Sequence, residues 1–207
     1  MAPRTSEQNR EIREQRMAQI LQATLELYGA KGYEGTEIGE IAEAAGLARG
    51  LVYYYFKDKQ TLFRRLFEHL IHHARGYSET ALFTEQPRLE RLRGFTEFFA
   101  RSAIDNPHYF LCYARMHHDF VAVGGPREGD APFADFENRF EKALAQFIAE
   151  GTSAGIFRQG PPELLASIYW HAVIGAMSFL VKLQASPEAK RQHLPVIIER
   201  CTSLLIA

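Results

Sequence analysis

The sequence predicts an all-α protein of about nine helices. Apolar residues recur at spacings of three and four along most of the 207-residue chain, which is the helical period. Glycines and prolines interrupt this pattern at intervals that leave segments of ordinary helix length. A third observation bears on function: residues 46–59 combine consecutive tyrosines with basic side chains, in a chain whose formal net charge is only -1.

The N-terminal residues predict a polar tail followed by a first helix. Residues 1–11 carry no apolar pattern, and we expect them to be disordered. The first helix is predicted from Glu11 to Tyr28, and Gly29 and Gly32 are expected to end it. Its apolar face comprises Met17, Ile20, Leu21, Thr24, Leu27 and Tyr28.

Two short helices joined by a glycine follow. Thr36 is the predicted N-cap of a helix over residues 37–45, with Gly39 where a capping-box glutamate would stand. Gly46 then turns the chain, and the next helix begins two or three residues later. This arrangement describes a helix-turn-helix, although an ordinary helical hairpin gives the same pattern.

Residues 46–59 favour contact with a polyanion. Their three tyrosines are adjacent, so at least one of them faces outward whatever the helical phase. Between Gly46 and Leu66 the cations Arg49, Lys57, Lys59, Arg64 and Arg65 stand against Asp58 alone. Phenols donate to phosphate oxygens and cations neutralise their charge, so the pattern indicates a local nucleic-acid site.

The rest of the chain predicts six more helices, with a loop at residues 121–131. Asn106-Pro107 is a strong helix-start signal, and prolines open the last two helices as well. The predicted segments are Asp58 or Lys59 to about Gly76, Leu89 to Phe99, Pro107 to Phe120, Phe133 to about Gly155, a helix opened by Pro161-Pro162, and a helix after Ser186-Pro187.

The motifs of the N-terminal third resemble those of one known protein family. The runs Thr36–Leu47 and Arg49–Phe63, with Ile20–Thr24 and Gly29–Tyr33 before them, resemble the TetR family of one-component bacterial transcriptional regulators. The resemblance extends over about residues 12–68, and the remainder agrees in length and helical pattern. It implies a helix-turn-helix DNA-binding domain at residues 1–58 and an effector-binding and dimerisation domain at residues 59–207.

The resemblance also implies roles for single residues. Arg49, Gly50 and Leu51 occupy positions that read base edges, and Phe56 occupies the position that anchors the recognition helix. The tyrosines fall where the family grips phosphates, and Thr36 and Lys59 match phosphate-contacting helix starts. The predicted DNA-binding residues are Thr36, Ala48, Arg49, Gly50, Leu51, Tyr53, Tyr54, Tyr55, Lys57 and Lys59.

Two departures from the family pattern concentrate base reading on Arg49. Many relatives carry Ser or Thr at the positions of Ala48 and Leu51. Ala48 therefore loses a capping hydroxyl, which costs about 1 kcal/mol if nothing replaces it. Leu51 offers apolar contact alone, for instance to a thymine methyl group, whereas Arg49 suits a guanine edge.

The ligand pocket and the dimer interface are less sharply marked. Aromatic residues with a few polar groups are typical of ligand cavities, but each of these residues alone fits core packing as well. Few charges are predicted to point inward, which favours an apolar or aromatic effector. The pocket candidates are Phe95, Phe99, Tyr113, Met116, His117, Phe147, Trp170, His171 and Ile174.

The last two predicted helices are apolar and suit a homodimer interface, although packing within one subunit is the alternative. The run Leu164–Val181 contains no Asp, Glu, Lys or Arg, and we interpret it as a helix buried on more than one face rather than a membrane span. Cys112 and Cys201 lack metal or redox spacing and fit free thiols in a reducing compartment, so we expect a cytoplasmic protein.

Enzymatic chemistry has little support in the sequence. No glycine-rich phosphate loop, nucleophile elbow or paired-carboxylate pattern occurs, so we expect no enzyme and no cofactor. His69 with His72 or His73 has the spacing of a metal pair but lacks a third ligand, so we expect no metal site. The predicted function is a ligand-responsive repressor of a palindromic operator. The alternative is a helical ligand-binding or enzymatic protein that retains the helix-turn-helix as scaffold.

Overall fold

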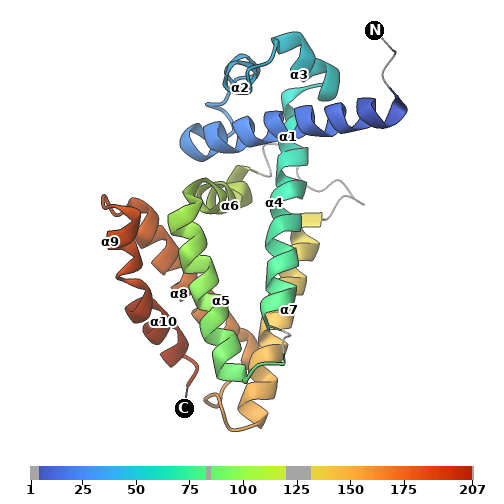
Figure 1. Cartoon of the computed structure of the whole chain (residues 1–207). Helices are drawn as coiled ribbons and strands as arrows, with labels where there is room; N and C mark the ends of the chain where they lie inside the picture. Colours follow the sequence, from blue (N-terminus) through green and yellow to red (C-terminus); the bar gives the residue numbers. More distant parts are fainter. Residues whose placement is uncertain (1–4, 83–84, 120–131, 207) are drawn as a thin grey trace. The chain divides into compact units, whose positions relative to one another are not determined.

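The computed structural model describes residues 5–82, 85–119 and 132–206, without the side chains of 73–81, 117–118 and 132–138. These residues form ten helices, and their one isolated β-bridge joins Phe157 to Ile206, which confirms the all-α prediction (Figure 1). The helices are α1 Ser6–Lys31, α2 Ile38–Ala44, α3 Arg49–Tyr55, α4 Lys59–Leu82, α5 Arg88–Asp105, α6 Pro107–Asp119, α7 Pro132–Ser153, α8 Pro162–Lys182, α9 Pro187–Arg191 and α10 Leu194–Ser203.

The chain divides into two compact units. The first comprises residues 1–70 and 111–130, and the second comprises residues 71–110 and 131–207. Both α4 and α6 therefore begin in one unit and end in the other. The functional boundary predicted between residues 58 and 59 stays a prediction. The predicted loop at 121–131 lies outside the described residues.

Helix α1 begins earlier than its apolar pattern indicated. The Thr5 hydroxyl accepts the Gln8 N–H at 3.2 Å, and the Gln8 side chain accepts the Thr5 N–H at 3.0 Å. This capping box satisfies two backbone donors at the helix start and extends the helix over residues predicted to be disordered. Gly29 lies inside the helix, and Gly32, with φ 74°, ends it. That φ favours glycine because it avoids the cost of a Cβ there.

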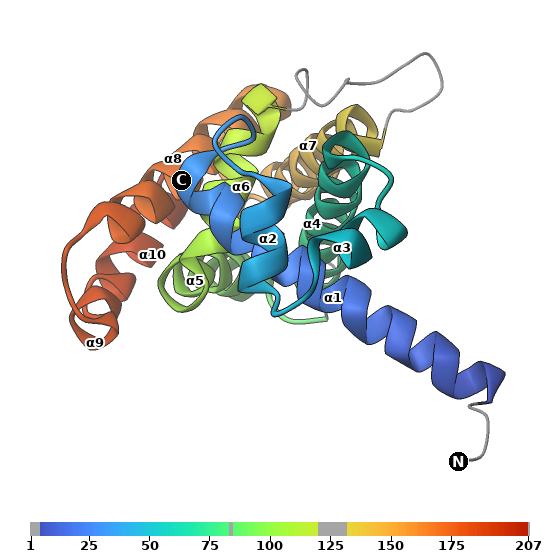
Figure 2. The ribbon, with the colours of Figure 1, turned by 90° about the horizontal axis from the view of Figure 1, so that it is seen from above.

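The core of the first unit is aromatic. α1 crosses the start of α4, and α2 and α3 lie on the opposite side of α1 from the rest of α4 (Figures 1 and 2). Phe63 on α4 is fully buried, and its ring centroid lies 5.3 Å from that of Tyr28 and 4.8 Å from that of Tyr33, both edge-on. Edge-to-face pairs of this kind add about 0.5–1.5 kcal/mol each beyond area burial.

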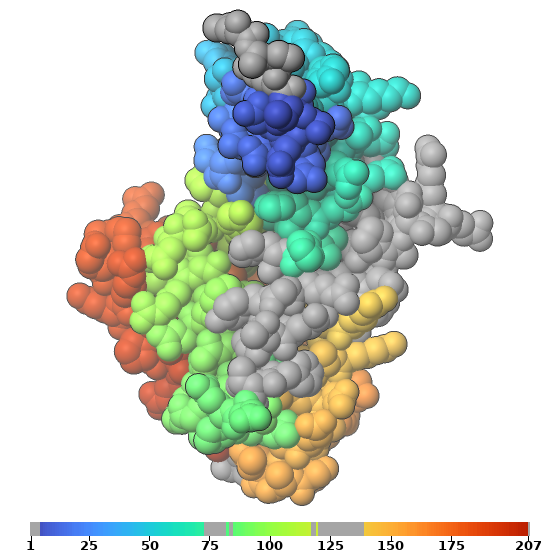
Figure 3. Space-filling model, turned by 45° about the vertical axis from the view of Figure 1, so that its right-hand side comes forward, coloured from blue at the N-terminus to red at the C-terminus, as the bar shows by residue number. Residues whose placement is uncertain are grey.

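In the second unit, α5 packs against α8 and α10. Ala100 and Ile104 of α5 meet Leu180 of α8 and Leu194 of α10 in one buried cluster. Figure 3 shows α9 and α10 lying directly against α5. The buried Thr96 and Tyr169 hydroxyls share a hydrogen bond of 2.7 Å, so two polar groups are satisfied inside this core.

The predicted ninth helix is two helices. α9 ends at Arg191, and α10 begins at Leu194 with Pro195 in its first turn. Proline has no N–H to donate and its ring clashes with the carbonyl four residues earlier, so one continuous helix is disfavoured here. This break accounts for the tenth helix among the described residues.

Helix α8 buries one face, which corrects the prediction that it is buried on more than one. Its buried residues recur every three or four positions, and Leu164, Ile168 and Phe179 are exposed on the remaining surface. By length and composition α8 alone among the described helices could cross a membrane, and apolar core helices share these features. The exposed apolar side chains mark a surface that nothing in the described chain covers.

Burial of Cys112 predicts that the protein becomes less stable at alkaline pH. The Cys112 thiol is fully buried, donates to the Leu25 carbonyl at 3.2 Å, and has a pKa raised by that burial to about 12. An unfolded chain loses this proton near pH 9 and the folded chain does not, so the unfolded state gains stability as pH rises above 9. The free energy of unfolding should fall by up to about 1.4 kcal/mol per pH unit.

Urea unfolding at pH 8, 9 and 10 measures this slope. Wild type should lose stability across the series, and Cys112→Ala should lose less. An equal slope in the two proteins would show that another group carries the effect.

Candidate nucleic-acid interface

A glycine turn joins α2 to α3. Gly46, at φ 65°, donates to the Glu43 carbonyl at 3.0 Å, and Leu47 donates to the Ala42 carbonyl at 2.9 Å. These two bonds form a Schellman motif, which ends α2 sharply and favours glycine at the left-handed position. The turn predicted from Gly46 is therefore present.

The start of α2 differs from the prediction. Its N-cap is Glu37, and Glu40, three residues later, accepts the Glu37 N–H at 3.4 Å. Thr36 is fully buried and donates its hydroxyl to the Gly32 carbonyl at 2.7 Å. The predicted Thr36 cap is wrong by one residue, so Gly39 does not occupy the capping position. A phosphate contact by the Thr36 hydroxyl does not fit this burial.

Helix α3 separates an inner face from an outer one. Val52 and, just after the helix, Phe56 are buried with at most 2% of their surface exposed. Tyr53 and Tyr54 are 43% and 73% exposed, which is unusual for aromatic side chains. The inner pair fixes the helix to its unit and leaves the tyrosines on the surface. Phe56 lies in the core, as predicted for an anchor.

Basic and aromatic side chains share the outer face. Arg49 is exposed, and its guanidinium carbon lies 5.8 Å from the centre of the Tyr53 ring. The Tyr54 and Tyr55 rings meet edge-on with centroids 5.1 Å apart. Lys57 is exposed, so the outer face offers cations beside phenol hydroxyls. Ala48 is the N-cap of α3 and forms no side-chain cap, as its side chain predicts.

Lys59 lies at the start of α4 and faces the turn before α2. Its ammonium nitrogen is 4.6 Å from the centre of the Tyr33 ring and 3.4 Å from the Glu34 carbonyl oxygen. Asp58 caps α4 by accepting the Thr61 N–H at 2.7 Å, and the hydrogen bonds from Thr61 lower the pKa of this carboxyl. The carboxylate cap offsets the unfavourable position of Lys59 at the positive helix end.

The last turns of α6 belong to the same unit. Asp119 accepts the Tyr33 N–H at 3.2 Å, and Arg115 donates to the Ala30 carbonyl at 3.4 Å. Burial, and then the negative charge of Asp119, raise the pKa of the Tyr28 phenol. Sequence reasoning did not find these partners because they are more than eighty residues from the turn that they contact.

The comparisons with known proteins agree with this geometry. Residues 20–66 match the model of the bacterial regulatory proteins, tetR family. The chain is 41% identical over 68 residues, 33% of this chain and 30% of the relative, to the HTH-type transcriptional regulator AcrR of Shigella flexneri. The match thus spans about a third of that relative. With the HTH-type transcriptional repressor AcnR of Corynebacterium efficiens it is 24% identical over 179 residues, 86% of this chain and 88% of the relative.

The fold likeness extends over nearly the whole chain. A crystal structure of a putative transcriptional regulator from Saccharomonospora viridis, in complex with choline, aligns with 94% of this chain and 99% of that one. Its TM-score is 0.73 at 19% sequence identity. By this match and these likenesses the chain is similar to the TetR family. This family comprises regulators, which confirms the prediction that the chain is not an enzyme.

The predicted pocket residues do not form one group. Phe95, Phe99 and Trp170 pack together, with centroids 4.8–6.1 Å apart. Phe147 lies elsewhere in the second unit, under the Arg88 and Arg91 guanidinium groups and against Phe157. Phe147 is buried there, and its place in a ligand pocket stays a prediction. Tyr113 and Met116 belong to the first unit, and the His117 side chain lies outside the described set.

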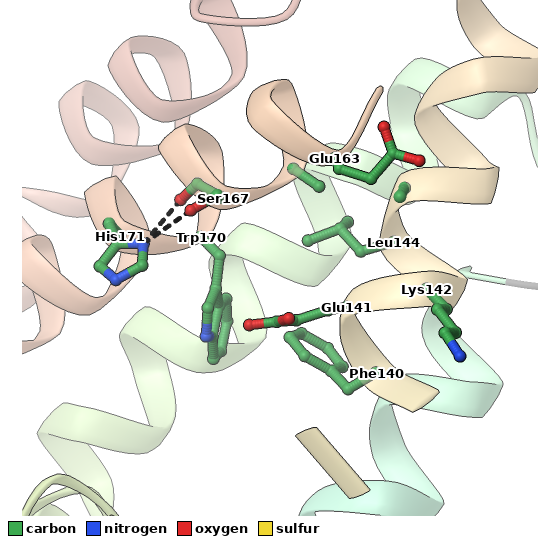
Figure 4. Close-up of a pocket in the computed structure, with 10 residues that line it drawn as sticks. Phe140, Glu141, Lys142, Leu144, Glu163, Ser167, Trp170 and His171 are labelled. Carbon is green, nitrogen blue, oxygen red and sulfur yellow. Dashed lines mark hydrogen bonds between the residues drawn. The ribbon is translucent and has the colours of Figure 1, made fainter. Parts of the chain in front are cut away.

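A cleft of about 310 Å³ opens between α7 and α8 (Figure 4). Of the predicted pocket residues, Trp170 and His171 line this cleft and Ile174 does not, and their role in ligand binding stays a prediction. His171 turns toward Ser167, whose carbonyl oxygen lies 2.8 Å from its Nδ1. The charged residues of the lining were not predicted, because exposed helix positions give no sequence signal that distinguishes a cleft from ordinary surface. The lining comprises Phe140, Glu141, Lys142, Leu144, Ala145, Glu163, Ala166, Ser167, Trp170 and His171.

The described residues contain no group of three His, Cys, Asp or Glu side chains placed to hold a metal ion. His69 and His72 are exposed, and His73 falls among the side chains that are not described.

Gly50 provides a direct test of the outer face. A Cβ added at Gly50 would meet no atom within 4 Å, so Gly50→Ala should stabilise the fold by about 0.5–1 kcal/mol through helix propensity. If α3 enters the major groove of DNA, the same methyl group would stand between the α3 backbone and the base edges. Thermal unfolding should therefore shift upward while affinity for duplex DNA falls severalfold.

Gly94→Ala on α5 is the matched control, because that glycine is also exposed and its Cβ would also meet no atom within 4 Å. It should raise stability and leave DNA affinity unchanged. Equal DNA affinity in Gly50→Ala and wild type would contradict the prediction that α3 contacts DNA.

Proposed function

We propose that this chain is a transcriptional regulator that binds palindromic double-stranded DNA as a homodimer. The observation that carries the proposal is the outer face of α3, where Arg49, Tyr53 and Tyr54 are exposed while Val52 and Phe56 hold the helix from within. A short helix presented in this way after a glycine turn has the geometry of a major-groove reader. The similarity to a transcriptional regulator and to a transcriptional repressor supports the same role.

The residues divide by the part of DNA that each can recognise. The Arg49 guanidinium can donate two parallel hydrogen bonds to the acceptors of a guanine edge. Gly50 and Leu51 lie beside it on α3. Tyr53, Tyr54, Tyr55 and the cations of Lys57 and Lys59 suit phosphates, which set position without reading sequence. Ala48 supports α3 through its backbone. We assign Thr36 no direct contact because it is buried.

The proposed dimer uses α8 and α10. Leu164 and Ile168 on α8 and Val196 on α10 are 47–57% exposed, and a run of such side chains is typical of an interface. A Cβ at Gly175 would meet no atom within 4 Å, so a partner helix can approach α8 closely at that point. Burial of this face in a dimer accounts for the apolar composition of α8 without a membrane.

The proposed signal is a small apolar or aromatic effector that binds the second unit and releases the DNA. The cleft between α7 and α8 and the adjacent ring cluster supply the apolar surface. α4 and α6 run from this unit into the DNA-reading unit, so a shift of either helix can reach the reader. The effector must bind the two states with different affinity, because equal affinity shifts nothing.

Repression is the proposed direction of control, and the cytoplasm is the proposed location, since DNA and free thiols are both found there. Both cysteines are buried and free, as expected in a reducing compartment.

Arg49→Ala tests the proposal. The DNA probe is a duplex enriched from a random pool by the wild-type protein, compared with a shuffled duplex of equal composition. Arg49→Ala should weaken binding to the enriched duplex by about 1–3 kcal/mol and reduce the preference between the two duplexes.

Lys57→Ala is the matched control for charge. It should weaken binding to both duplexes equally and reduce the number of counterions released on binding by about one. Unchanged selectivity in Arg49→Ala would overturn its role. The absence of salt-dependent DNA binding in wild type would favour the alternative, in which the helix-turn-helix is only scaffold.

A further inference from the structure

The cleft between α7 and α8 holds a carboxylate beside aromatic rings. Trp170 is half-buried, and its ring centroid lies 4.8 Å from that of Phe140 and 5.0 Å from that of Phe99. In Figure 4 the Glu141 carboxylate extends toward Trp170 and lies above the Phe140 ring. The cleft therefore presents an anion and two π systems to the same space.

Within the described lining, no positive charge lies between the Glu141 carboxylate and Trp170. The face of an aromatic ring carries negative potential, so a carboxylate beside it repels the π system, whereas a cation between them attracts both. Among the described residues no ion pair involves Glu141, Lys142 or Glu163. Figure 4 shows the Lys142 ammonium pointing away from Trp170, so it does not lie between Trp170 and the Glu141 carboxylate.

The remaining lining suits an apolar group. Leu144, Ala145 and Ala166 are buried and form apolar wall, and the volume of about 310 Å³ accommodates a small organic molecule. Glu141 and Glu163 make the charge of the lining more negative than positive, which disfavours an anionic ligand. An apolar body with one positive charge satisfies both parts of the cleft.

We propose that this cleft binds an organic amine: a monocation with an aromatic or apolar body, its charge held between Glu141 and Trp170. The inference rests on the proposed function, in which the second unit receives an effector, and it names the chemical class of that effector. It adds an electrostatic element to an effector that the sequence described only as apolar or aromatic.

Three probes of similar shape and different charge test the proposal: 2-phenylethylamine, 2-phenylethanol and phenylacetate. Trp170 is the one tryptophan of the chain, so fluorescence excited at its red edge reports occupancy of this cleft in the full-length protein. The protonated amine should bind about tenfold more tightly than the alcohol, which corresponds to about 1.4 kcal/mol. Phenylacetate should bind most weakly.

Glu141→Gln should abolish the preference for the amine and leave the affinity for the alcohol unchanged. Glu90→Gln, which removes an exposed carboxylate of α5 outside the cleft, should retain the preference. Equal binding of the three probes, tighter binding of phenylacetate, no saturable response to the amine, or a preference that survives in Glu141→Gln would each overturn the proposal.

The two proposals fail separately. DNA binding by wild type and Arg49→Ala depends on α3 and is measured without any amine. Intact DNA recognition with no amine preference would reject the ligand class alone.

Discussion

The buried ring of Phe63 is the contact on which the DNA-reading unit depends. It lies on the first turns of α4 and meets Tyr28 of α1 and Tyr33 of the following turn edge-on. Phe67, one turn later, packs against Tyr28 with centroids 5.6 Å apart. These contacts fix α1, the turn and α4 together, because rings packed edge-on in a dense interior tolerate little displacement.

The short helices inherit their geometry from this aromatic core. A seven-residue helix is not stable in water alone, since nucleation costs more than so few hydrogen bonds return. Val52 and Phe56 supply the tertiary contacts that α3 needs, and the Gly46 turn sets where it begins. Burying these two side chains leaves Arg49 and the tyrosines on the surface without weakening the fold. The polar contacts of Asp119 and Arg115 bring α6 to the same turn.

Local patterns in the sequence predicted most of the helices. The break at Gly46, the start at Pro107 and the burial of Phe56 follow from chemistry within a few residues. The N-cap of α2 was misplaced by one residue because Thr36 and Glu37 are both capable of capping, and only burial decides between them. The apolar spacing runs on through Pro195, so the break before α10 is not marked by the hydrophobic pattern and follows from the proline alone.

Contacts between distant segments were harder to predict. Phe147 and Trp170 are equally aromatic, yet only the second lies at a cleft, because that depends on how α7 and α8 pack. Glu141 belongs to an exposed helix position that resembles ordinary surface in the sequence. The exposed apolar face of α8 likewise cannot be identified until the packing of its neighbours is known. The uncharged run in α8, which the sequence indicated to be buried core, is therefore now a proposed interface.

In the proposed complex, two copies of this chain present two α3 helices to one palindromic duplex. Sedimentation equilibrium of the full-length protein, alone and with the enriched duplex, measures the number of chains in each species. We expect a dimer in the absence of DNA and an even number of chains on each duplex. A monomer that binds the duplex one chain at a time would contradict it.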